Sequence, residues 1–230
     1  MKKKYLIIIG AVALVALAAI GGTMASDYFQ SEGKVAGTIS EKSLEVSIVD
    51  EDGNTIDDAD ELASEIVPGA QIPFCREVAN LNENGYDMYV KVSIYYDWSG
   101  DLSAASYENE YFTLYIDGEE IPSVADYADE NGEYVTIGDW IVAEAEEGSV
   151  VLYYTKPLSY NETATFLSSI AFSKDMGNEY AGEELELEYE VNAVQANNSQ
   201  DAIAAEWGVF PVFDDTDSTL IVGISETKAE

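Results

Sequence analysis

The stretch 184-ELELEYEVNAV-194 decides the fold class of this chain. Glutamates alternate with apolar residues, and the apolar positions are Leu185, Leu187, Tyr189, Val191 and Ala193. Successive side chains of a β-strand point to opposite faces, so the alternation predicts a long strand with one buried face. The four glutamates on the other face need water, which places that face on the outside.

The same period of two recurs in 86-YDMYVKVSIYYDW-98, which predicts a second long strand. Shorter runs predict strands at 43–49, 72–81, 111–116, 134–137, 140–145, 150–155 and 164–172. Turn signals separate these runs: NENG at 82–85, IDGEEI at 116–121 and EEGS at 146–149 each predict a hairpin. The first hairpin would join strand 72–81 to strand 86–98.

Helix signals are few. Ser199 is a suitable N-cap for a helix in 197-NNSQDAIAAEWG-208, and Gly208 is suited to end it. Residues 57–66 predict a second short helix, and the uncharged, β-prone stretch 218-STLIVGIS-225 predicts a last strand. We therefore expect an all-β, mainly antiparallel fold: a jelly-roll-like β-sandwich with one or two short helices, as a single domain over 26–230.

Residues 1–25 have the three parts of a secretory signal peptide. Three lysines at 2–4 precede an apolar run over 5–20, which is short for a membrane span. Small residues follow and place the cleavage between Ala25 and Ser26. The alternative is an uncleaved anchor. Cleavage predicts a secreted protein that meets the membrane only before the signal is removed.

The composition is strongly acidic, with 45 Asp and Glu against 10 Lys and Arg and a formal charge of −35. Loss of the three signal lysines leaves 7 basic residues against 45 acidic ones, a charge of −38. Such a chain repels nucleic acid and anionic lipid headgroups. Disorder is not expected, because 47% of the residues are hydrophobic.

The chain has no histidine and a single cysteine, Cys75. This excludes Ser-His-Asp and Cys-His nucleophile systems, the HExxH zinc site and thiolate zinc sites. Cys75 cannot form an intrachain disulfide and, in the apolar stretch IPFCREV, is predicted to be a core thiol. Carboxylate chemistry remains, so a secreted hydrolase with paired acids stays open as a second alternative function.

Acidic residues concentrate in 49-VDEDGNTIDDADE-61. An EF-hand loop counted from Asp50 needs glycine at its sixth position, and Thr55 occupies that position, so the motif fails. A calcium site of another kind, built from Asp50, Asp52 and Asp57, stays open beside the alternative of a solvated acidic loop. No cofactor other than calcium is expected.

Tyrosine is abundant, with 16 in the chain. The strand patterns place Tyr89, Tyr95, Tyr115 and Tyr153 opposite the core. Exposed rings on a sandwich can stack on sugars, so a carbohydrate-binding or adhesion module for cell-wall or matrix glycans is the first alternative function. The competing interpretation is that loops or the other sheet cover these rings.

Three stretches resemble the TasA/camelysin family of Gram-positive bacteria. The first, 21-GGTMASDYFQSEGKVAGTIS-40 followed by LEVSI, is similar to the cleavage region of that family and the strand after it. The others are 67-VPGAQIPFCREVANLNENGYDMYVKVSIYYDW-98 and 191-VNAVQANNSQDAIAAEWG-208. Signal peptides of this family are processed by the signal peptidase SipW, so the resemblance implies secretion by that route.

The resemblance further implies a jelly-roll domain and a structural role at the cell surface or in the biofilm matrix. In TasA itself, subunits form fibres in which the N-terminal segment of one subunit adds as a strand to the next. The partners would be copies of this chain or related matrix subunits. Camelysin has been classed as a zinc metalloprotease, but this chain has no histidine. We therefore expect a non-enzymatic protein.

The composition of residues 26–40 also fits a donated strand. Tyr28, Phe29, Val35 and Ile39 can fill a groove while the main chain pairs with a sheet edge. Two glycines, at 33 and 37, weaken an intramolecular strand. Head-to-tail addition of this kind builds a filament. The competing interpretation is that the segment folds back on its own domain as an edge strand.

Overall fold

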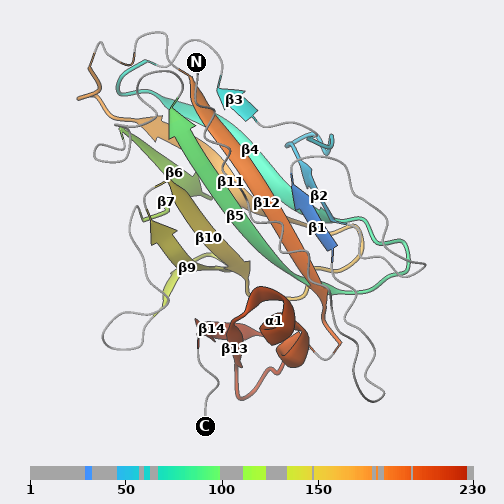
Figure 1. The fold of residues 1–230 in the computed structure, drawn as a ribbon. Coiled ribbons are helices and arrows are strands. Elements are labelled where there is room, and N and C mark those ends of the chain that lie inside the picture. The colour runs from blue at the N-terminus through green and yellow to red at the C-terminus, as the bar shows by residue number, and fades with distance from the viewer. Residues whose placement is uncertain are drawn as a thin grey trace, which may run out of the picture.

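The computed structural model describes residues 29–32, 46–56, 60–62, 67–98, 111–122, 134–146, 148–177, 180, 184–197 and 199–226. Its strands form two antiparallel sheets that lie face to face, with a helix and a small hairpin at one end (Figure 1). This confirms the predicted all-β sandwich. Sheet A has the order β1 (Phe29–Glu32), β12 (Leu185–Gln195), β5 (Met88–Trp98), β10 (Ser149–Tyr154), β9 (Trp140–Glu146) and β8 (Val135–Ile137), and β3 (Asp60–Leu62) also pairs with β12. Sheet B has the order β2 (Val46–Val49), β4 (Gln71–Asn80), β11 (Thr163–Phe172), β6 (Phe112–Ile116) and β7 (Glu119–Glu120).

The chain winds between the two sheets as in a jelly roll. Strands β4 and β5 are consecutive in the sequence, as are β10 and β11. Yet β4 pairs with β11 in sheet B, while β5 pairs with β10 in sheet A. Both connections therefore cross from one sheet to the other, which is the winding expected of a jelly roll.

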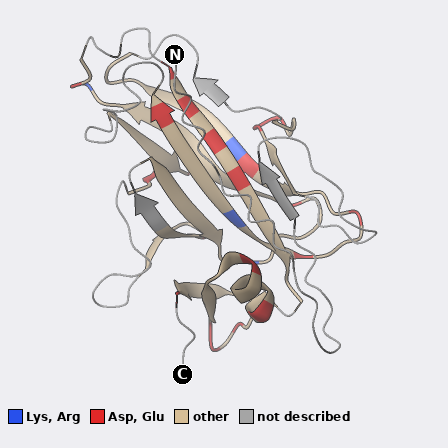
Figure 2. Ribbon diagram, viewed as in Figure 1, with Lys and Arg blue, Asp and Glu red and all other residues tan. Residues whose placement is uncertain are grey.

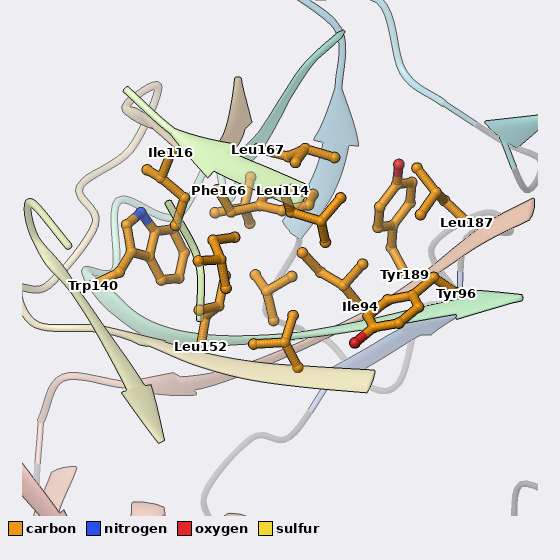
Figure 3. Close-up of a cluster of buried hydrophobic side chains, with 14 of the residues drawn as sticks. Ile94, Tyr96, Leu114, Ile116, Trp140, Leu152, Phe166, Leu167, Leu187 and Tyr189 are labelled. Carbon is orange, nitrogen blue, oxygen red and sulfur yellow. The ribbon is translucent and has the colours of Figure 1, made fainter. Parts of the chain in front are cut away.

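The two long predicted strands lie side by side in sheet A, with β12 towards one edge. β5 and β12 pair along their whole length, from Met88 opposite Gln195 to Trp98 opposite Leu185. Alternate apolar positions of both strands face sheet B and form the core between the sheets (Figure 3). Its labelled residues are Ile94, Tyr96, Leu187 and Tyr189 with Trp140 and Leu152 from sheet A, and Leu114, Ile116, Phe166 and Leu167 from sheet B.

The hairpin predicted at NENG is wrong, because the chain crosses between the sheets there. The fully buried side chain of Asn80 ties the crossing together. Its Nδ2 donates to the carbonyl oxygens of Tyr86 (2.9 Å) and Leu158 (2.8 Å), and its Oδ1 accepts the backbone N–H of Asn82 (2.9 Å). These bonds satisfy the carbonyl of Tyr86 and the buried N–H of Asn82 on either side of the crossing, and they add a second donor to the carbonyl of Leu158.

The other two predicted hairpins are confirmed. β6 and β7 are joined through Asp117 and Gly118, whose φ angles of 49° and 86° are those of a two-residue type I′ turn. β9 and β10 pair from Glu146 opposite Ser149, with Gly148 at a φ of 81° in the turn.

A third layer covers one end of the outer face of sheet A. It consists of helix α1 (Ser199–Trp207) and the hairpin of β13 (Phe210–Phe213) and β14 (Ile221–Ser225), as Figure 1 shows. The predicted helix and last strand are thus confirmed, and Gly208 ends the helix at a φ of 72°. Residues of this layer and of the outer face of sheet A pack together in a second apolar cluster. Its members are Tyr89, Ile141, Ala143, Tyr153, Val194, Ala202, Ile203, Trp207, Val209, Ile221 and Ile224.

Two local predictions fail. Residues 57–66 were predicted to be a helix, but within them Asp60–Leu62 form strand β3, which pairs with Leu185–Leu187 of β12. The remaining residues of that range lie outside the described part. Cys75 is half-buried on β4 rather than in the core, and desolvation is the main cause that raises its pKa.

Candidate functional site

The feature with the clearest bearing on function is the outer edge of β12. One side of β12 pairs with β5 throughout. The other side pairs with two short strands: the four residues of β1, with Phe29 opposite Ala193 and Glu32 opposite Glu190, and the three residues of β3 at Leu185–Leu187. Glu188 and Tyr189 lie between these two pairings. The longest edge in sheet A is therefore closed by two separate pieces of chain.

The inner face of β12 is firmly held in the sandwich at this edge. Val191 and Ala193 are fully buried, and the ring of Tyr189 contacts that of Phe166 edge-on, with centroids 5.5 Å apart. On the outer face, Nδ2 of Asn192 donates to Oε1 of Glu190 at 3.2 Å. The strand that receives β1 is thus well packed, and its register is set by its buried side chains.

The structure describes only part of the predicted donor segment. Phe29 begins β1, which pairs with β12 of the same chain. In a single chain, Phe29–Glu32 therefore form an edge strand of their own domain. Tyr28, Val35 and Ile39 lie outside the described residues, as do Ala25 and Ser26 of the predicted cleavage site.

The acidic loop after β2 uses its first carboxylate internally. Oδ1 of Asp50 accepts the backbone N–H groups of Asn54 (2.8 Å) and Asp52 (3.0 Å), and the Asn54 side chain donates to Oδ2 at 3.0 Å. The side-chain bond from Asn54 is the main cause that lowers the pKa of Asp50. Asp57 lies outside the described residues. Among those described, no three His, Cys, Asp or Glu side chains come close enough together to hold a metal ion.

The predicted row of exposed tyrosines is wrong at two positions. Tyr89 and Tyr153 are only 1% and 2% exposed, because α1 and the β13–β14 hairpin cover them. The hydroxyl of Tyr89 donates to the carbonyl oxygen of Thr219 at 2.8 Å, and the ring of Tyr153 contacts Trp207. Tyr95 and Tyr115 are partly exposed but belong to different sheets, so the four do not form one platform.

The rest of the outer face of sheet A is acidic. Glu186 and Glu188 are exposed on β12, and Asp97 of β5 lies directly opposite Glu186. Figure 2 shows acidic positions recurring along β12. A second molecule of the same acidic charge is repelled by these carboxylates, so this face does not favour close contact between copies.

The sequence predicts β12 but not the way in which its outer edge is closed by two short strands. Alternation identifies the buried face of a strand, whereas it carries no information on which strands lie beside it. The pairing of Asp60–Leu62 with β12 also went unforeseen, because these residues have no β-strand pattern of their own.

Comparison of the chain with family models, with curated proteins and with solved structures finds no match in any of the three. The resemblance to the TasA/camelysin family therefore rests on the sequence stretches alone. Within the described residues, no helix has the length and apolar character needed to cross a membrane. The apolar run over 5–20 lies outside them.

Proposed function

We propose that this chain is a secreted, non-enzymatic structural protein of the cell surface or biofilm matrix, which polymerises when its N-terminal segment adds as a strand to a neighbouring copy. The proposal includes signal cleavage between Ala25 and Ser26 by a SipW-type peptidase. The observation that carries it is the outer edge of β12, where a short N-terminal strand covers four residues of the side that β5 leaves free.

The pairing of β1 with β12 supports the exchange because either copy can supply the strand. If Phe29–Glu32 of one copy replaces the same residues of another, every backbone bond of the register is kept. The exchange then costs no hydrogen bonds. It requires only that four residues leave their own edge, and a strand this short is easily displaced compared with β5, which pairs with β12 over eleven residues.

The charge of the chain makes such assembly dependent on conditions. Copies with a formal charge near −38 repel each other at low ionic strength, and at about 0.15 M salt the repulsion is screened beyond roughly 8 Å. Backbone hydrogen bonds at a strand edge form only at contact, so two copies must first approach each other through this repulsion. Salt, acid or calcium should therefore help the copies to reach contact distance.

A truncation tests the proposal. Two proteins are purified, one beginning at Ser26 and one beginning at Ala36, which lacks β1. Both are imaged by electron microscopy and sized by light scattering under identical conditions. We expect filaments from the first and not from the second, whose fold is checked by circular dichroism. Equal polymerisation of the two, with both folded, would contradict the role given to the segment.

A further inference from the structure

We infer that the outer face of sheet B is a contact surface for a second copy of this chain, separate from the β12 edge. The surface is made of six residues, here called the sheet B patch: Gln71, Pro73, Thr113, Tyr115, Ser169 and Ala171. They lie in two rows across three strands. Gln71, Ala171 and Thr113 form one row, and Pro73, Ser169 and Tyr115 form the other.

The alternation of the strands places this patch on the outside. The residues between its members, Ile72, Leu114 and Ile170, pack into the core between the sheets. Gln71 and Pro73 are exposed and the other four are partly exposed. The surface is held in shape by its own bonds, since Nε2 of Gln71 donates to Oγ of Ser169 at 2.9 Å.

The sheet B patch carries no charge, although the chain has 45 acidic residues. Two glutamates border the patch. Glu77 lies farther along β4, opposite Thr165, and Glu120 lies on β7, opposite Tyr115. The outer face of sheet A offers no comparable area in the described part of the chain, because it is acidic at one end and covered by α1 and the hairpin at the other. Two copies that meet through the sheet B patch therefore place no carboxylate at the centre of the contact, and Glu120 lies only at its border.

The chemistry of the patch suits contact with itself. An interface with twofold symmetry brings the same patch together from both copies, so its groups must be self-complementary. The Gln71 amide and the hydroxyls of Thr113, Ser169 and Tyr115 each both donate and accept hydrogen bonds. Ala171 and Pro73 have side chains short enough for two sheets to approach to about 10 Å, the usual spacing of stacked sheets.

Pairing of copies along the edge of β4 is disfavoured by Pro73. The carbonyl of Ala70 points towards β11, because it accepts the N–H of Phe172. Backbone groups of successive residues in a strand point to alternate sides. Those of Gln71 and Pro73 therefore point away from β11. β2 pairs with β4 only at Glu77–Asn80, which leaves that side uncovered by β2 at Pro73. Proline has no N–H to offer there, which favours face-to-face stacking over edge pairing.

Charge insertion tests the inference. In the protein beginning at Ala36, which lacks β1, Ser169→Glu places a carboxylate at the centre of the patch, and Gln71→Glu adds one with almost no change of shape. Thr136→Glu is the matched control, because Thr136 is exposed on β8 of the other sheet. Self-association is measured by sedimentation equilibrium in high salt, and folding by circular dichroism.

We expect both patch variants to weaken self-association by more than about tenfold and the control to leave it within about twofold, because a contact that buries unpaired charge is costly. The inference is overturned if the parent protein is monomeric at every concentration, or if Gln71→Glu associates as tightly as the parent. Retention of the monomer on a neutral polysaccharide, lost in Gln71→Glu, would instead assign the patch to a glycan. The protein beginning at Ala36 cannot associate through β1, so this inference and the proposed strand exchange can fail separately.

Discussion

Replacing Asn80 by alanine removes the side chain that fixes the crossing from sheet B to sheet A. Three hydrogen bonds are lost, to the carbonyl oxygens of Tyr86 and Leu158 and from the N–H of Asn82. Leu158 keeps a partner, because its carbonyl oxygen also accepts the N–H of Met88 at 3.0 Å. The N–H of Asn82 loses the acceptor at Oδ1, in a residue that is 1% exposed.

The expected cost follows from these bonds. Each hydrogen bond contributes about 1 kcal/mol net, and a buried donor left without an acceptor adds about 1 to 3 kcal/mol. Three bonds and one unpaired donor together predict that Asn80→Ala lowers the free energy of unfolding by about 4 to 6 kcal/mol, a large share of the 5 to 15 kcal/mol typical of a domain.

The assay is urea unfolding at pH 7, followed by the fluorescence of the three tryptophans. Asn84→Ala is the control. Asn84 is exposed, and its side chain donates only a single bond, to Oδ1 of Asn82 at 3.1 Å, so its loss should cost less than about 1 kcal/mol. The reasoning is refuted if Asn80→Ala stays within about 1 kcal/mol of the parent, or if the two variants are equally unstable.

Three further predictions concern the third layer, the acidic turns and assembly. A Cβ at Gly223 would stand 2.2 Å from Cε2 of Tyr134, so Gly223→Ala should destabilise the protein by about 1 to 3 kcal/mol in the same unfolding assay; a change below about 0.5 kcal/mol would contradict the close packing seen there. Hydrogen bonds from Thr216 hold the pKa of Asp214 below its usual 3.8, so the stability it contributes is present above the unfolded pKa and lost as the pH falls through the lower folded value. Asp214→Asn should therefore reduce the acid dependence of unfolding below about pH 4, and an unchanged acid limb would count against this. Assembly should increase as the pH falls from 7 to 4, because protonation reduces the acidic charge; fibre counts by electron microscopy that stay constant over this range would show that charge does not control it.

The strands could be predicted from the sequence because their signal is local. The alternation in 86–98 and 184–194 reports directly which side chains are buried, and β5 and β12 begin and end within two residues of those bounds. The turns at 116–121 and 146–149 were also predictable. Asp117, Gly118 and Gly148 have positive φ angles there, and Asp-Gly pairs and glycine adopt such angles readily.

The errors arise where distant segments decide the outcome. NENG signals that the chain turns, but only the bonds of Asn80 to Tyr86 and Leu158 reveal that the next strand joins the other sheet. Tyr89 was assigned to the outside because its strand alternates, and the layer that buries it comes from residues 199–226. Asp60–Leu62 have the composition of a helix, and pairing with β12 overrides it.

The site itself was foreseen only in part. Phe29 was predicted to lie in a pairing segment, and it does begin a strand. The strand that receives it, β12, was predicted for its buried face, while its edge depends on which strands lie beside it. No pattern in 184–194 distinguishes an edge that is closed over its whole length from one closed by two short pieces.

Which copy supplies β1 can be measured directly by disulfide trapping. Phe29 and Ala193 are register partners, and facing residues of antiparallel strands lie about 4.5 to 5.5 Å apart, within disulfide range. All chains carry Cys75→Ser. Chains carrying only Phe29→Cys are mixed with chains carrying only Ala193→Cys under assembly conditions and oxidised. In the control mixture, Glu188→Cys replaces Ala193→Cys, because Glu188 does not lie opposite Phe29. Strand donation predicts disulfide-linked pairs of the first two variants and few with the control. Absence of these pairs, while a chain carrying both cysteines closes only upon itself, would contradict donation between copies.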